Sequence, residues 1–175
     1  ACRRPISMRI AFILSLLALS SLHAGPGGEL PEFTATDASA WINSAPLRIA
    51  DLRGKVVLLE FWAFDCHNCS RSAPWLNSLR QKWPDASFVV VGVHTPEFEH
   101  EKDRKNLERS MRRQGVRHAV MMDNDYAYWR SLNNRYWPAF YLADKEGVIR
   151  GVFIGETHAG DAQARAMERQ IAELL

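Results

Sequence analysis

The sequence contains little cysteine, three residues in 175, and this scarcity excludes a small fold held together by many disulfides. It also lacks an excess of charge of one sign. Its 22 basic residues stand against 20 acidic ones, so the charge gives no indication of a nucleic-acid partner. The apolar run near the N-terminus has about 13 residues, whereas a membrane-spanning helix needs roughly 20. What remains is a chain long enough for one domain with a sizeable core.

The N-terminal residues have the layout of a secretory signal peptide. A basic start at Met8-Arg9 precedes the apolar run Ile10–Leu22, and the small Ala24 follows it. We predict cleavage after Ala24, although Leu22 is not the small residue preferred at its position. Residues 1–7 would then come from a start assigned too far upstream. The alternative to a signal peptide is that the apolar run is a membrane anchor. Cleavage would leave 19 basic and 20 acidic residues in a protein exported to the periplasm or a similar compartment, where disulfides persist.

The expected mature chain contains two cysteines, Cys66 and Cys69. Cys2 precedes the apolar run, so it is not a lipid-attachment cysteine, which would follow that run, and it lies in the predicted signal peptide over 1–24. Residues 25–29, with the sequence GPGGE, are predicted to be a linker. Residues 30–175 are then expected to form one domain.

The two cysteines lie where an apolar strand meets a helix, in the stretch KVVLLEFWAFDCHNCSRSAP. The run from Val56 to Phe64 is rich in β-branched and aromatic residues, which is typical of a strand buried on both faces. Helical spacing of apolar residues follows over 70–83. The first turn of a helix stabilises an anion, so Cys66 is expected to ionise readily and act as a nucleophile. Cys69, one turn later, is within reach to close a disulfide.

Glu60 is a carboxylate inside this apolar strand. Burial would raise its pKa. We interpret it as a proton acceptor for Cys69, acting directly or through water. The alternative is a glutamate at the edge of the sheet that faces water.

The remaining pattern predicts a sheet flanked by helices. The expected strands are 41–47 at an edge, 87–93, 118–122, 140–143 and 148–154; the expected helices are 97–115, 126–133 and 161–175; a turn is expected at 51–54. The strand–helix–strand order over 56–93 predicts a right-handed parallel unit. His94 follows the second strand and could line the site.

Several motifs resemble those of the thioredoxin superfamily. FWA-x-x-C-x-x-C is similar to the thioredoxin active-site signature, Pro74 follows the second cysteine by five residues, and Pro138 precedes the predicted hairpin. The extra strand–helix pair at 87–123 and the N-terminal extension resemble the exported TlpA-like branch. The phrases closest to the thioredoxin-like domain of DipZ-type proteins are GKVVLLEFWAFDCHNC, VVGVHTPEFEHEKD, MDNDYAYWRSLNNRYWPAFYLAD and GVFIGE.

This resemblance implies an α/β thioredoxin fold with a central mixed β-sheet, and it implies roles for particular residues. Cys66 would attack, Cys69 would resolve the mixed disulfide, and Glu60 stands where thioredoxins keep a buried aspartate. Pro138 would follow a cis peptide bond, so that the backbone of Trp137 can pair with an extended substrate strand. The residues expected to contact the substrate are Trp62, His67, Asn68 and Trp137. No cofactor or metal is implied, and we expect a monomer.

The chain departs from the thioredoxin pattern between its cysteines, where His67-Asn68 replaces Gly-Pro. A protonated His67 would stabilise the Cys66 thiolate and make the couple more oxidising. The glutamate at position 60 is also one methylene longer than aspartate. DipZ-type proteins carry a membrane electron-transfer domain that is not found in this sequence. We therefore expect a separate electron donor or acceptor, membrane-bound, besides the protein thiols or disulfides that serve as substrates.

Two functions of different classes follow from these residues. The favoured one is an exported thiol–disulfide oxidoreductase. The alternative is a copper chaperone that binds the metal with Cys66, Cys69 and a histidine such as His94, because thiolates and imidazole suit Cu(I). A peroxidase is weaker, since Ala63 occupies the position where a peroxidatic site would have threonine. The direction of electron flow and the client protein remain open at this point.

Overall fold

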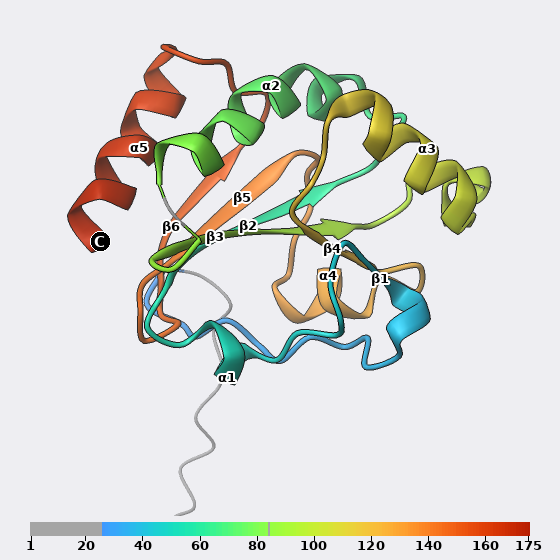
Figure 1. Ribbon diagram of the computed structural model, residues 1–175, viewed down its shortest axis with the longest axis horizontal. Coiled ribbons are helices and arrows are strands. Elements are labelled where there is room, and N and C mark those ends of the chain that lie inside the picture. Colours follow the sequence, from blue (N-terminus) through green and yellow to red (C-terminus); the bar gives the residue numbers. More distant parts are fainter. Residues whose placement is uncertain (1–25, 84) are drawn as a thin grey trace, which may run out of the picture.

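The computed structural model describes residues 26–83 and 85–175, so the predicted signal peptide over 1–24 lies outside the described residues. Six strands form one sheet in the order β1-β4-β3-β2-β5-β6 (Figure 1). The strands are β1 Trp41–Ile42, β2 Val56–Trp62, β3 Phe88–His94, β4 Ala119–Met122, β5 Ala139–Ala143 and β6 Ile149–Ile154. The helices are α1 Ile49–Leu52, α2 His67–Lys82, α3 Arg104–Gln114, α4 Ala127–Ser131 and α5 Ala162–Leu174, with 3-10 turns η1 Ala38–Ala40 and η2 Glu99–Lys102.

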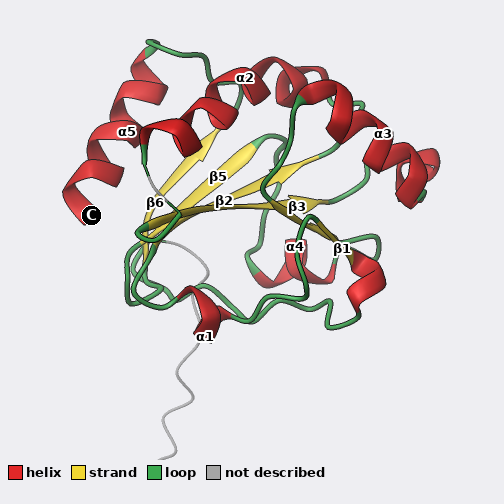
Figure 2. Ribbon diagram, in the orientation of Figure 1, coloured by secondary structure: helices red, strands yellow, loops and turns green. Residues whose placement is uncertain are grey.

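The sheet is mixed, which confirms the predicted fold class. β2 and β3 run parallel, as do β3 and β4, whereas β5, β6 and β1 are antiparallel to their neighbours. Helices α2, α3 and α5 cover one face, while α1 and α4 lie on the other (Figure 2). This double cover explains why all seven residues of β2 are buried, as its unbroken apolar pattern predicts.

Alternation along β2 assigns its side chains to the two faces. Val57, Leu59 and Phe61 pack in the core on the α1 and α4 side. Leu58 packs against α2 and α5, in a cluster that includes Leu76. Since successive side chains point to opposite faces, Glu60 and Trp62 share the face of Leu58, beneath α2. In the described part of the chain, none of the helices is long and apolar enough to cross a membrane.

Four predicted segments differ in the structure. The edge strand expected over 41–47 is reduced to Trp41–Ile42. The expected helix over 97–115 is divided into η2 and α3, because Asp103 takes an extended backbone and its side chain caps α3 by accepting from the Asn106 N–H. The turn expected at 51–54 overlaps the one-turn helix α1, which includes Asp51 and Leu52. Residues 26–29 of the predicted linker lie against the sheet, where Gly27 N–H donates to the Ile149 carbonyl at 2.8 Å.

Candidate active site

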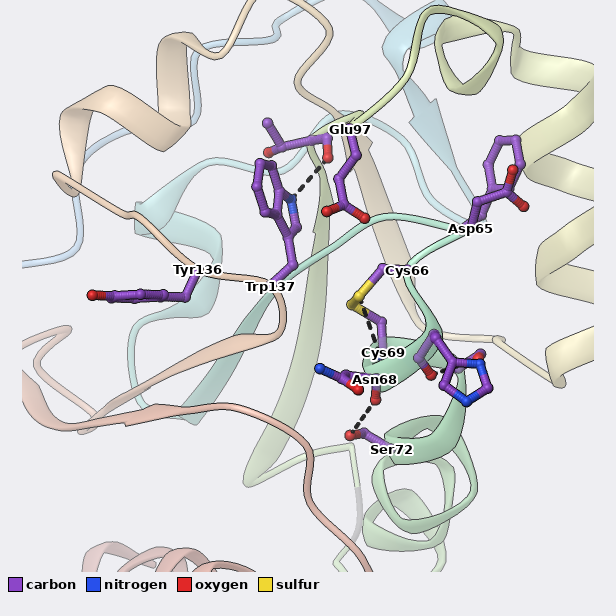
Figure 3. Close-up of a disulfide and its surroundings, with 12 residues drawn as sticks. Asp65, Cys66, Asn68, Cys69, Ser72, Glu97, Tyr136 and Trp137 are labelled. Atoms are coloured by element: carbon purple, nitrogen blue, oxygen red, sulfur yellow. Dashed lines mark hydrogen bonds between the residues drawn. A yellow bond between two sulfur atoms is a disulfide. The ribbon is translucent and has the colours of Figure 1, made fainter.

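The structure joins Cys66 and Cys69 in a disulfide, with their Cα atoms 5.3 Å apart (Figure 3). Cys66 is the N-cap of α2, and its sulfur accepts from the Cys69 N–H at 3.2 Å. The Cys69 amide, in the first helical turn, is therefore directed at the sulfur that must carry negative charge in the reduced form. The two cysteines differ in access, since Cys66 is 7% exposed and Cys69 is 2% exposed. This order suits attack by Cys66 and resolution by Cys69.

The loop that precedes Cys66 is held by side chains from β3, η2 and α3. The Phe64 N–H donates to His94 Nε2 at 3.2 Å, and the Asp65 N–H donates to Glu101 Oε1 at 2.9 Å. Gln114 Nε2 also donates to the Phe64 carbonyl at 3.3 Å. The side chains of His94, Glu101 and Gln114 thus fix the backbone that presents the nucleophile.

Glu101 was not identified from the sequence. In the structure its carboxylate joins the loop before Cys66 to the segment that follows β3. The side chain is fully buried. Besides the Asp65 N–H, it accepts from the N–H groups of Glu97 and Phe98, at 2.5 and 2.8 Å. One signal could have indicated it, because an acidic residue three positions after the start of a helical turn is typical of a backbone cap.

We expect Glu101→Ala to lower the free energy of unfolding by about 2–3 kcal/mol, because buried N–H groups lose their charged acceptor. Disulfide exchange should slow as well, since the loop before Cys66 loses an anchor. Thermal or urea unfolding and an insulin-reduction assay would measure the two effects. The matched control is Glu99→Ala, because Glu99 is an exposed neighbour that pairs with Lys102. Equal stability of the two variants would show that the Glu101 contacts do not hold this loop.

Glu60 lies on β2 opposite Gly92 of β3 and Phe140 of β5. It is 4% exposed, so the alternative of a water-facing glutamate is wrong. Burial raises the pKa of this carboxyl group to about 8. A carboxyl with such a pKa is suited to exchange protons near neutral pH.

The peptide bond between Trp137 and Pro138 is cis, as the resemblance implies. Figure 3 shows Trp137 and Tyr136 among the residues around the disulfide. The Trp137 indole N–H donates to the Thr95 carbonyl at 2.9 Å, and its ring lies 4.2 Å from that of Trp129. Tyr136 is 53% exposed. This loop therefore combines an anchored tryptophan with an aromatic ring that is free to contact another protein.

The other residues predicted to contact the substrate differ from one another in exposure. His67 and Asn68 are exposed on the first turn of α2. Trp62 is 2% exposed and packs edge-on against His94, with ring centroids 5.2 Å apart. Its prediction as a surface contact fails because the indole turns inward, under α2 and α3.

The metal hypothesis gains no support from this geometry. His94 is buried, and its Nε2 accepts the Phe64 N–H. Within residues 26–83 and 85–175, no group of three or more His, Cys, Asp or Glu side chains could hold a metal ion. Burial also lowers the pKa of His94 to about 3, so it is neutral and serves as a hydrogen-bond acceptor for the loop.

Comparisons with known proteins agree with this geometry. The model of the AhpC/TSA family matches residues 26–152. The chain is 40% identical over 121 residues to Protein DipZ of Mycobacterium tuberculosis, covering 67% of this chain and 17% of that protein. It is 29% identical over 146 residues to the thiol-disulfide oxidoreductase YkuV of Bacillus subtilis, covering 83% of this chain and 93% of YkuV.

A solved structure also shares the fold. A candidate thiol:disulfide interchange protein DsbE from Chlorobium tepidum superposes with a TM-score of 0.71 at 23% identity, covering 85% of this chain and 96% of that one. The chain thus spans under a fifth of the length of the DipZ protein but nearly all of YkuV. The predicted resemblance to thioredoxin-like proteins, DipZ-type proteins included, is confirmed.

Proposed function

The chain belongs to the AhpC/TSA family, and from this membership and its bonded cysteine pair we propose that it is an exported protein thiol–disulfide oxidoreductase. The observation that carries the proposal is the Cys66–Cys69 disulfide at the N-terminus of α2. A disulfide that interconverts with a dithiol carries two electrons, and the N-terminus of a helix stabilises the thiolate of the reduced form. Ala63 stands where a peroxidatic site would have threonine, so we propose disulfide exchange rather than peroxide reduction.

The proposed reaction begins with the reduced pair. The Cys66 thiolate attacks one sulfur of a client disulfide, forms a mixed disulfide and releases the other client sulfur as a thiolate. Cys69 then loses its proton and attacks the Cys66 sulfur, which breaks the bond to the client. The client gains two electrons, and Cys66 and Cys69 are left as a disulfide. The reverse sequence oxidises a client dithiol, and both directions use the same residues.

Glu60 is the proposed acceptor of the Cys69 proton. Cys69 is almost fully buried, so solvent cannot readily remove this proton, and Glu60 is on the sheet face beneath α2. The cis-Pro138 loop is the proposed client-binding segment, in which the Trp137 backbone pairs with an extended client strand. Tyr136 and Phe98 are 53% and 56% exposed, and we propose that they supply apolar contact on either side.

The client and partner are proposed from chemistry alone. Protein disulfides or dithiols exchange with Cys66, and a separate membrane-bound protein supplies or removes the electrons. Export is supported by the signal-like N-terminal sequence. His67 is proposed to stabilise the Cys66 thiolate when it is protonated and so to raise the reduction potential.

The direct test is the reduction of insulin disulfides by the purified protein in the presence of dithiothreitol. We expect measurable catalysis, and we expect Cys66→Ser to reduce it to the uncatalysed rate because the attacking sulfur is gone. Ser70→Ala is the control, since Ser70 follows the motif and its hydroxyl bonds only to the His67 carbonyl among described residues. Full activity of Cys66→Ser would contradict the proposed function.

A further inference from the structure

The side chain of Glu97 lies beside the disulfide and is not used by the proposed reaction. Figure 3 shows it among the residues around the cysteine pair, with its carboxylate directed toward Cys66 and the indole of Trp137 next to it. Glu97 is exposed, so other molecules have access to its charge. A client whose sulfur reaches Cys66 must therefore come close to this carboxylate.

The backbone that carries Glu97 is fixed next to the loop that presents the nucleophile. One carboxylate, that of Glu101, accepts from the Asp65 N–H at 2.9 Å and from the Glu97 N–H at 2.5 Å. On the other side, the Trp137 indole N–H donates to the Thr95 carbonyl at 2.9 Å. The segment with Glu97 is thus held between the residue before the attacking cysteine and the predicted client-binding loop.

The Glu97 carboxylate has no cation from its own chain to neutralise it. Among the described residues it forms no ion pair, whereas Asp65 pairs with His100 at 2.5 Å and Arg71 pairs with Glu156 at 2.8 Å. Partial burial and a neighbouring carboxylate raise the pKa of Glu97, as expected for an anion without a compensating charge. A cation brought by another molecule would supply that charge.

The aromatic side chains near Glu97 favour the same sign of charge in a ligand. Trp137 lies next to its carboxylate, and Tyr136, which is 53% exposed, precedes Trp137 on the same loop (Figure 3). The face of an aromatic ring attracts a cation, and tryptophan does so most strongly. A carboxylate beside such rings suits the ammonium group of lysine or the guanidinium group of arginine, and it repels an acidic side chain.

We propose that Glu97 selects clients that carry a lysine or arginine beside the cysteine with which Cys66 reacts. This inference rests on the proposed function and defines the client class by charge. The Glu97 carboxylate binds the client cation while the Trp137 backbone pairs with the client strand, and together they present the client sulfur to Cys66. Glu97 contacts the client but not the reacting sulfurs, so the electron and proton balance of the exchange is unchanged.

The test compares two small disulfides of opposite charge: cystamine, with two ammonium groups, and dithiodiglycolate, with two carboxylates. Each is mixed with the reduced protein near neutral pH, and the second-order rate of protein oxidation is measured by acid quenching, alkylation of free thiols and mass spectrometry. Dividing by the rate of mercaptoethanol with the same disulfide removes the intrinsic reactivity of the probe. We expect a normalised ratio of about ten in favour of cystamine, since attraction and repulsion each change a rate about threefold.

Glu97→Gln should lower this ratio to about two, and Glu97→Lys should reverse it in favour of dithiodiglycolate. The ratio does not depend on the reactivity of Cys66 itself, because both probes meet the same thiolate. The control is Glu99→Gln, which removes the same charge from an exposed neighbour that pairs with Lys102, and it should keep the wild-type ratio.

Three results would overturn the inference: a wild-type ratio near one, a ratio unchanged by both Glu97 variants, or an equal decrease in Glu99→Gln. Failure of the reduced wild type to react with either disulfide would instead contradict the proposed function.

Discussion

Cys69→Ser is expected to convert the protein into a trap that holds its client through a disulfide to Cys66. In the wild type, the Cys69 sulfur is bonded to that of Cys66, so it can displace a client from the mixed disulfide. Serine keeps the shape of this buried position but cannot attack sulfur, so the intermediate should accumulate to about one client per protein. Incubation of reduced Cys69→Ser with insulin, followed by non-reducing electrophoresis and mass spectrometry, would measure the adduct.

Two controls make this result specific. Dithiothreitol should release the adduct completely, and the double variant Cys66→Ser/Cys69→Ser should form none. An adduct on the double variant, or wild-type turnover by Cys69→Ser, would rule out the assigned order of attack and resolution. The same trap, applied to an extract of the exported proteins of the source cell, would identify the physiological client.

Glu60→Gln is expected to make the protein more stable and less active. The pKa of Glu60 is raised to about 8 by burial, whereas an exposed glutamate ionises near 4.3. The penalty for this buried acid is absent below about pH 4.3, grows as pH rises, and is complete above about pH 8. We therefore compare the free energy of unfolding of Glu60→Gln with that of the wild type at two pH values. The advantage of the variant should be about 3–5 kcal/mol larger at pH 8 than at pH 4.

The activity of Glu60→Gln should change in the opposite sense. Glutamine cannot accept the Cys69 proton, so the resolving step should slow by about 100-fold, within the range found for loss of a general base. Attack by Cys66 should remain at the wild-type rate. Urea unfolding at pH 4–9 and stopped-flow kinetics would measure the two effects. Glu173→Gln, an exposed change on α5, is the control. A wild type whose stability is flat between pH 5 and pH 8 would contradict the role of burial.

The sequence predicted the parts of the site that depend on local pattern. The unbroken apolar run of β2 indicated a strand buried on both faces, and the two cysteines three residues apart indicated a disulfide at a helix start. The cis bond before Pro138 was implied by the resemblance to thioredoxins, which keep a cis-proline at this position. Each of these features depends on a few adjacent residues or on one family motif.

The residues that the sequence did not identify depend on the register of distant segments. Glu101 lies in an acidic stretch typical of a solvated helix. It is buried because η2 ends at Lys102, before α3 begins, and the Glu101 carboxylate accepts from the Asp65 N–H. Trp62 was predicted to contact the substrate for the same reason. The sequence does not show that α2 and α3 cover its side of β2 and bury its indole.

The most direct test of the account is a redox titration of the purified protein in glutathione buffers, with alkylation of free thiols and mass spectrometry of the products. The account predicts one reversible two-electron transition in which Cys66 and Cys69 are both alkylated or both protected. It also predicts a potential above the roughly −270 mV of thioredoxin. If the two cysteines did not interconvert between dithiol and disulfide, or were alkylated independently, the central claim would be contradicted.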